Sequence, residues 1–107
     1  MVTGLCEEHT PTREALGSQY TFTHTSYAAM LDEVEVDIIA VGDYYGVRGE
    51  RVIAALERGK HVIADKPLCT SLAELDRIEQ LAAEKGLSVF CQVLEAVDGL
   101  AIARQPR

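Results

Sequence analysis

Polar and aromatic side chains follow three apolar segments of this 107-residue chain. The groups are Glu7-Glu8, Asp43-Tyr44-Tyr45 and Asp65-Lys66-Pro67. Carboxylates accept hydrogen bonds from hydroxyl groups, and an ammonium group can polarise a carbonyl or assist a proton transfer. If the three segments are parallel strands, their carboxyl ends share one edge of a sheet, where open α/β sheets bind ligands. The sequence therefore predicts one crevice lined by all three groups.

Each group also has a purely structural interpretation. Glu7 and Glu8 precede a predicted helix, and its dipole favours acids at that end. Asp43 and the tyrosines after it could form a turn that shields the core, and Lys66 could be an exposed turn residue. Only the coincidence of the three groups at strand ends favours a functional site.

Strand and helix patterns alternate along the chain. The starts of three apolar segments, Val36, His61 and Leu87, are 25 and 26 residues apart, the length of one strand–helix unit. Such alternation predicts an α/β fold with parallel strands and right-handed crossovers. We expect strands at 2–7, 20–23, 36–42, 61–64 and 87–92, and helices at 10–17, 26–33, 47–58 and 71–86.

Composition excludes several classes of protein. Seventeen acidic against ten basic residues give a net charge of −7, which disfavours nucleic acid as a partner. No apolar run is long enough for a membrane helix, and the N-terminus does not resemble a signal peptide. The histidines lack metal-ligand spacing, so no metal site is expected, and His61 is predicted to be a hydrogen-bonded structural residue. Three widely spaced cysteines fit a cytoplasmic protein; they are Cys6, Cys69 and Cys91.

The segments AALERGKHVIADKPL and VDIIAVGDYYGVRGE carry a resemblance to a known family. Together with the following helix and LSVFCQ, they resemble the Rossmann domain of the Gfo/Idh/MocA family of NAD(P)-dependent oxidoreductases. The resemblance covers about residues 2–92. It implies a partial Rossmann-type parallel sheet with flanking helices over 1–92, while 93–107 forms a divergent tail.

The resemblance also implies roles for individual residues. Glu7 matches the acid that holds the adenosine ribose hydroxyls, which favours NAD over NADP. Asp43 and Tyr44 match the pair beside the nicotinamide ribose. Asp65, Lys66 and Pro67 match the Glu-Lys-Pro motif of the family, whose lysine is assigned to catalysis. We expect the Lys66–Pro67 peptide to be cis.

The chain departs from the family pattern in several places. Asp65 replaces a glutamate, and Arg48 stands where many members have histidine. The usual first strand, its glycine-rich turn and the C-terminal substrate domain are not found. We therefore expect a truncated protein that binds the dinucleotide weakly, turns over little and could form homo-oligomers. In its full-length form it would oxidise or reduce a sugar or cyclitol.

Two other interpretations remain open from the sequence. One is a non-catalytic Rossmann-like remnant. The other is a response-regulator receiver, with Asp43 as phospho-acceptor and Lys66-Pro67 as its conserved turn. The spacing disfavours a receiver, because receivers insert a further strand–helix unit between these two features.

Overall fold

The computed structural model describes residues 3–42 and 44–92. The chain divides into two compact units, an N-terminal unit (Met1–Val36) and a C-terminal unit (Asp37–Arg107). The expected tail, 93–107, lies outside the described residues. The helices and strands are α1 (Thr10–Leu16), α2 (Tyr27–Glu33), β1 (Ile38–Val41), α3 (Tyr45–Glu57), β2 (His61–Asp65), α4 (Leu72–Lys85) and β3 (Val89–Gln92).

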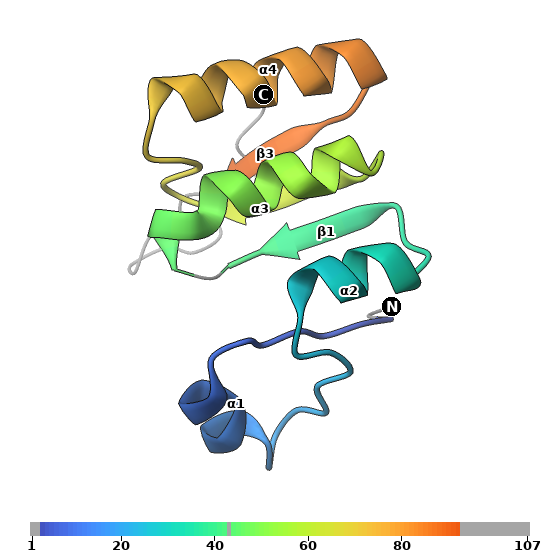
Figure 1. The fold of residues 1–107 in the computed structure, drawn as a ribbon, viewed down its shortest axis with the longest axis vertical. Helices are drawn as coiled ribbons and strands as arrows, with labels where there is room; N and C mark the ends of the chain where they lie inside the picture. Colours follow the sequence, from blue (N-terminus) through green and yellow to red (C-terminus); the bar gives the residue numbers. More distant parts are fainter. Residues whose placement is uncertain (1–2, 43, 93–107) are drawn as a thin grey trace. The chain divides into compact units, whose positions relative to one another are not determined.

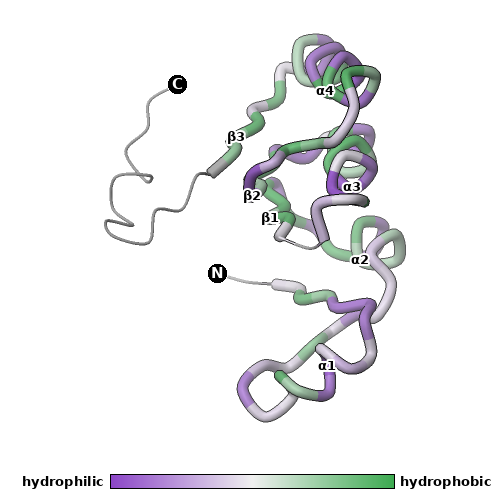
Figure 2. The backbone as a smooth tube through the Cα atoms, turned by 90° about the vertical axis from the view of Figure 1, so that its left-hand side faces the viewer, coloured by the Kyte–Doolittle hydropathy of each residue, from purple (hydrophilic) through white to green (hydrophobic). Residues whose placement is uncertain are grey.

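The C-terminal unit is a parallel sheet covered by helices (Figure 1). The strand order is β1-β2-β3, with both neighbouring pairs parallel. Helices α3 and α4 follow β1 and β2 and lie together on one face of the sheet, as Figure 2 also shows. This arrangement confirms the predicted α/β class and its parallel strands.

Burial alternates along the strands as a pleated sheet requires. In β1, Ile39 and Val41 are buried, and in β2, Val62 and Ala64 are almost fully buried. Two helices complete this core with apolar side chains at helical spacing. Those side chains are Val52, Ala55 and Leu56 from α3 and Ile78 and Leu81 from α4.

The opposite face of the sheet is apolar and open within the described residues. Ile38 and Phe90 are 54% and 51% exposed. They border a shallow hollow of about 190 Å³ that His61 and Ile63 also line. The Nδ1 atom of His61 accepts a hydrogen bond from the Ser88 amide at 3.0 Å, which confirms the predicted structural role of this histidine.

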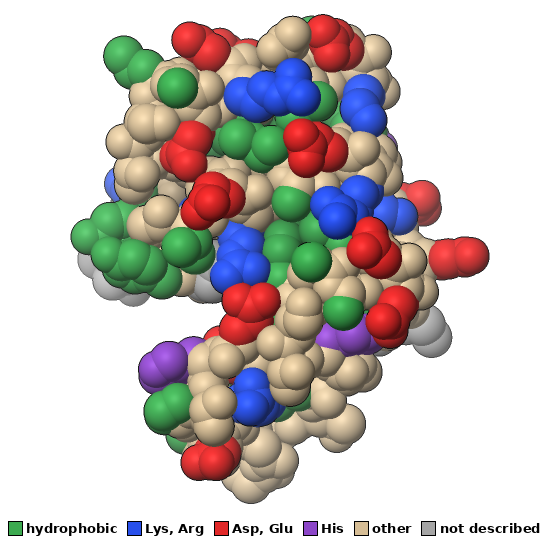
Figure 3. All heavy atoms as spheres, viewed as in Figure 1, with side chains coloured by type: hydrophobic (Ala, Val, Ile, Leu, Met, Phe, Trp, Pro, Cys, Tyr) green, Lys and Arg blue, Asp and Glu red, His purple; other side chains and the backbone are tan. Residues whose placement is uncertain are grey.

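Local signals set the ends of the helices. The Ser71 hydroxyl accepts from the Glu74 amide at 3.1 Å, which is one half of a capping box. The Glu74 carboxylate accepts from the Thr70 amide at 3.3 Å, one residue before the Ser71 amide that a complete capping box would use. At the other end of α4, Gly86 has a φ of 67°, a left-handed conformation that glycine adopts at little cost. The face of the C-terminal unit that α3 and α4 cover carries charged side chains. Acidic and basic groups are interspersed over it (Figure 3).

In the N-terminal unit, the prediction of two strands is wrong. The segments 2–7 and 20–23 form no strand in the described residues. One parallel bridge joins Cys6 of the first segment to His24, the residue after the second. The Leu5 carbonyl accepts from the Thr23 and His24 amides at 2.8 and 3.2 Å, and from the Thr23 hydroxyl at 3.1 Å. The Leu5 amide donates to the Thr23 hydroxyl at 2.9 Å, where a longer ladder would use a backbone carbonyl. A side-chain bond of this kind competes with strand pairing.

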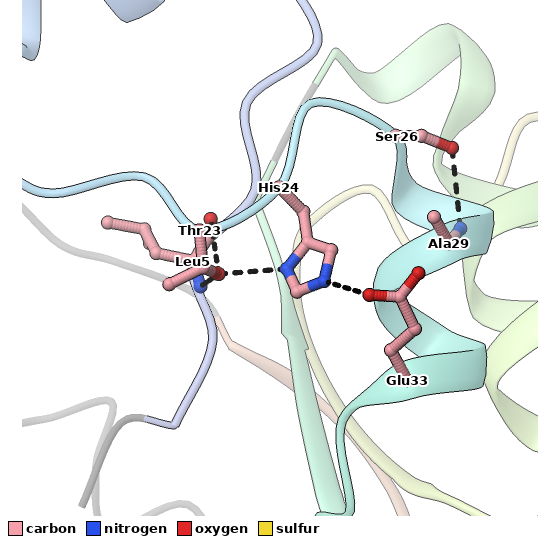
Figure 4. A network of polar contacts seen from close by, with 6 residues as sticks. All are labelled: Leu5, Thr23, His24, Ser26, Ala29 and Glu33. Atoms are coloured by element: carbon pink, nitrogen blue, oxygen red, sulfur yellow. Dashed lines mark hydrogen bonds and ion pairs between the residues drawn. The ribbon is translucent and has the colours of Figure 1, made fainter.

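A histidine connects this bridge to α2 (Figure 4). The His24 ring is hydrogen-bonded to the Thr23 hydroxyl at 2.9 Å and to the Glu33 carboxylate at 3.0 Å. Ser26 caps α2 by accepting from the Ala29 amide. None of the helices in 3–42 and 44–92 is long and apolar enough to cross a membrane.

Candidate functional site

The candidate site of the C-terminal unit lies at the carboxyl ends of β1 and β2. The register pairs Val41 with Ala64, so the next residues, Gly42 and Asp65, lie side by side where the strands end. A Cβ atom on Gly42 would lie 3.4 Å from the Asp65 carboxylate. The chain after β1 therefore passes close beside this acid, at a distance where a Cβ atom would make an ordinary contact.

An exposed aromatic pair follows β1. Tyr44 occupies the N-cap position of α3 and is 66% exposed. Its ring centroid is 4.7 Å from that of Tyr45, at an interplanar angle of 44°. A side chain on Gly46 would collide with the Tyr44 ring, so glycine allows this ring to cover the first turn of α3. Asp43 lies outside the described residues.

Lys66 leaves the sheet directly after β2. It is exposed, whereas Asp65 before it is half-buried. The Lys66–Pro67 peptide is cis, which confirms the sequence-based expectation. The sequence thus correctly places an acid, an amine and a proline turn at the end of a buried parallel strand.

Arg48 is the residue whose part in this site the sequence analysis missed. It is only 6% exposed, and its Nη1 atom donates to the carbonyls of Asp65 at 3.2 Å and Pro67 at 3.0 Å. These carbonyls flank Lys66 in the chain. A signal existed, because Arg48 continues the buried stripe of α3 formed by Val52 and Ala55, where an unbalanced charge is costly.

Contacts with α3 and α4 hold the far end of the same loop. The Thr70 amide donates to the Glu74 carboxylate. That carboxylate packs on Gly49 of α3, where any side chain would overlap it. The loop from Lys66 to Ser71 is therefore anchored near both ends, by Arg48 and by Glu74.

Cys91 lies on β3 opposite Ala64, beside this loop. Loss of hydration raises the pKa of its thiol; the Arg48 guanidinium opposes the rise and the Asp65 carboxylate reinforces it. Because the residue as a whole is exposed, its desolvation is incomplete. The shift indicates a thiol that stays protonated at neutral pH rather than a reactive nucleophile.

Glu7 belongs to the N-terminal unit. Its carboxylate accepts from the His9 amide at 3.0 Å, and its carbonyl accepts from Arg13 at 2.7 Å. The neighbouring Glu8 carboxylate accepts from the Tyr27 amide at 2.8 Å, at the start of α2. Glu8 thus has a structural role, while half-buried Glu7 remains a candidate ligand for a hydroxyl group.

The structure brings four of the predicted site residues to one edge of the sheet: Tyr44, Asp65, Lys66 and Pro67. This edge offers an aromatic face, a carboxylate and an ammonium group. Such groups suit a ligand with hydroxyl, carbonyl and planar aromatic parts. In the described residues, no group of three histidine, cysteine or acidic side chains could hold a metal ion.

Comparisons with known proteins point to one class. Residues 1–93 match the GFO_IDH_MocA family model, described as an oxidoreductase family with an NAD-binding Rossmann fold. A dTDP-3,4-didehydro-2,6-dideoxy-α-D-glucose 3-reductase of Actinomadura kijaniata is 38% identical over 61 residues, which are 57% of this chain and 18% of the reductase.

Solved structures give the same result. An oxidoreductase domain protein from Kribbella flavida matches with a TM-score of 0.66 and 30% identity, over 81% of this chain and 24% of that one. The 3-ketoreductase KijD10 from Actinomadura kijaniata, crystallised with TDP-benzene and NADP, matches with a TM-score of 0.71 and 27% identity, over 85% and 29%.

The chain spans about a fifth of the length of the curated relatives it matches. The family match nevertheless covers all described residues, in both units. It agrees with the parallel sheet and its flanking helices. The chain belongs to the Gfo/Idh/MocA family of oxidoreductases, whose members have an NAD-binding Rossmann fold.

Proposed function

We propose that this chain binds a nicotinamide dinucleotide at the carboxyl ends of β1 and β2, as part of an oxidoreductase. The observation that carries the proposal is the exposed Lys66, on a turn anchored after the buried strand β2 of a family member. The carboxyl edge of a parallel sheet is the usual ligand site of such folds.

Each site residue then has a role that its chemistry allows. Tyr44 and Asp43 border the nicotinamide ribose, with the Tyr44 ring as a flat apolar surface. Asp65 accepts from a hydroxyl group, and Pro67 completes the turn. Lys66 is the catalytic residue: its ammonium polarises the reacting carbonyl or assists proton transfer. The bound cofactor supplies hydride chemistry.

Glu7 accepts from the adenosine ribose in this proposal. A carboxylate at that position binds a 2′-hydroxyl and repels a 2′-phosphate, which favours NAD over NADP. Its half-buried carboxylate already accepts one amide hydrogen bond and has lone pairs left for a hydroxyl donor.

We propose a sugar or cyclitol as the substrate of the whole protein. The support is the sugar 3-reductase among the relatives and the 3-ketoreductase crystallised with TDP-benzene and NADP. The alternative is a non-catalytic remnant, which the departures from the family pattern at Asp65 and Arg48 keep open.

A titration of NADH fluorescence with the purified chain tests binding. We expect saturable binding that is weaker than in a whole dehydrogenase. Lys66→Met removes a charged donor and is expected to weaken binding about tenfold. The matched control is Lys60→Met, because Lys60 precedes the opposite end of β2. Equal losses in both variants, or no saturable binding by the wild-type chain, would favour the remnant.

A further inference from the structure

We propose that Arg48 is a positioning residue, which holds the turn that presents Lys66 to the ligand. The inference rests on the proposed function of Lys66 but on separate observations. It assigns a task to a buried arginine of α3.

The geometry singles out one residue of the turn. A single nitrogen, Nη1 of Arg48, donates to the carbonyl before Lys66 and to the carbonyl after it, at 3.2 and 3.0 Å. Two bonds from one atom fix the relative position of these peptide groups. The main chain is therefore held on both sides of Lys66, while its side chain stays exposed.

The source of the guanidinium also matters. Arg48 lies in the first turn of α3, which follows β1. The carbonyls that it binds belong to Asp65, the last residue of β2, and to Pro67 in the turn after it. Its contacts therefore connect the chain after one strand to the chain after the next, and Tyr44 and Lys66 belong to these two segments. Rigid placement of ligand-binding groups on different segments is what a binding edge requires.

The burial of Arg48 also indicates that its charge has a specific role. At 6% exposure the guanidinium has lost most of its hydration, which is costly unless hydrogen bonds replace it. An apolar side chain at this position of the α3 stripe would avoid that cost but would leave the two carbonyls without these bonds. We infer that the Arg48 charge is tolerated at this buried position because its hydrogen bonds order the turn around Lys66.

A double-mutant cycle on NADH affinity tests the inference. Arg48→Met and Lys66→Met are each expected to weaken binding about tenfold, and the double variant is expected to bind no more weakly than Lys66→Met alone. Arg48→Lys keeps a donor and is expected to recover part of the loss. Added ethylguanidinium is expected to restore part of the NADH affinity that Arg48→Ala loses. Additive losses in the double variant would overturn the inference, because a general structural role does not depend on Lys66.

A second measurement separates this inference from the proposed function. In the cofactor-free chain, NMR signals of Lys66 are expected to shift in Arg48→Met, while those of Val62 and Leu56 in the core stay unchanged. Unchanged Lys66 signals overturn the inference even if NADH binds. Failure of the wild-type chain to bind NADH overturns the proposed function, and the Lys66 signals still decide the role of Arg48. If Arg48→Met does not fold, Arg48→Lys and the Arg48→Ala rescue carry both measurements.

Discussion

The two units of this chain are stabilised in different ways. Among the described residues, nine buried hydrophobic side chains lie in the C-terminal unit, and two, Met30 and Leu31, lie in the N-terminal unit. The N-terminal unit instead relies on hydrogen bonds around Thr23 and His24. Apolar burial contributes more stability than partly exposed hydrogen bonds do. The C-terminal unit can therefore keep a strand edge rigid enough to hold a site.

The largest expected effect comes from the core of the C-terminal unit. Leu56 is fully buried, so Leu56→Ala is expected to lower the free energy of unfolding of this unit by about 3 kcal/mol. Met30→Ala, the matched change in the N-terminal unit, is expected to cost less, because Met30 is 9% exposed in a smaller core. Native-state hydrogen exchange reports both units separately.

The control for these variants is Leu72→Ala. Leu72 is 78% exposed, so we expect a change within about 0.5 kcal/mol. Equal losses for Leu56→Ala and Met30→Ala would contradict the proposed difference between the two units.

A smaller effect is expected from the two serine caps. Ser71→Ala removes the acceptor of the Glu74 amide and is expected to destabilise α4 by about 1 kcal/mol. Ser26→Ala removes the same kind of bond, to Ala29, from α2. We expect faster amide exchange in α4 for the first variant and in α2 for the second. Spread of either effect across both units would show that they unfold together.

The smallest expected effect concerns Cys91. Because its pKa is raised in the folded state, this thiol favours folding below its ordinary pKa, and that contribution is lost as the pH rises through the raised value. Labelling by iodoacetamide, followed by mass spectrometry, is expected to reach half its maximal rate at a higher pH in the folded chain than in urea. Identical pH profiles would contradict the raised pKa.

The sequence predicted most of the C-terminal unit because its signals are local. Ser71 and Glu74 mark the start of α4, and Gly86 marks its end. Helix α3 begins at Tyr45, two residues before its expected start. The start was predicted too late because Tyr45-Gly46 has the composition of a loop. Lys66 was correctly placed after the strand, because a strand cannot continue through the proline that follows, Pro67.

Other features depend on contacts between residues distant in sequence. Thr23 binds Leu5 across 18 residues, and no local pattern in the sequence shows this contact. Arg48 reaches carbonyls 17 and 19 residues away. Its position in an apolar stripe was visible in the sequence, but the groups that it binds follow only from how α3 packs on β2.

The most direct test of the central claim is an NMR titration of the isotope-labelled chain with NADH. We predict that the largest saturable shifts occur at Gly42, Tyr44 and Lys66, where β1 and β2 end, and at Glu7 in the N-terminal unit. Ile38 and Phe90, which line the open face of the sheet, should change little. Saturable shifts confined to that open face, or none at Lys66, would contradict a dinucleotide site at the carboxyl ends of the strands.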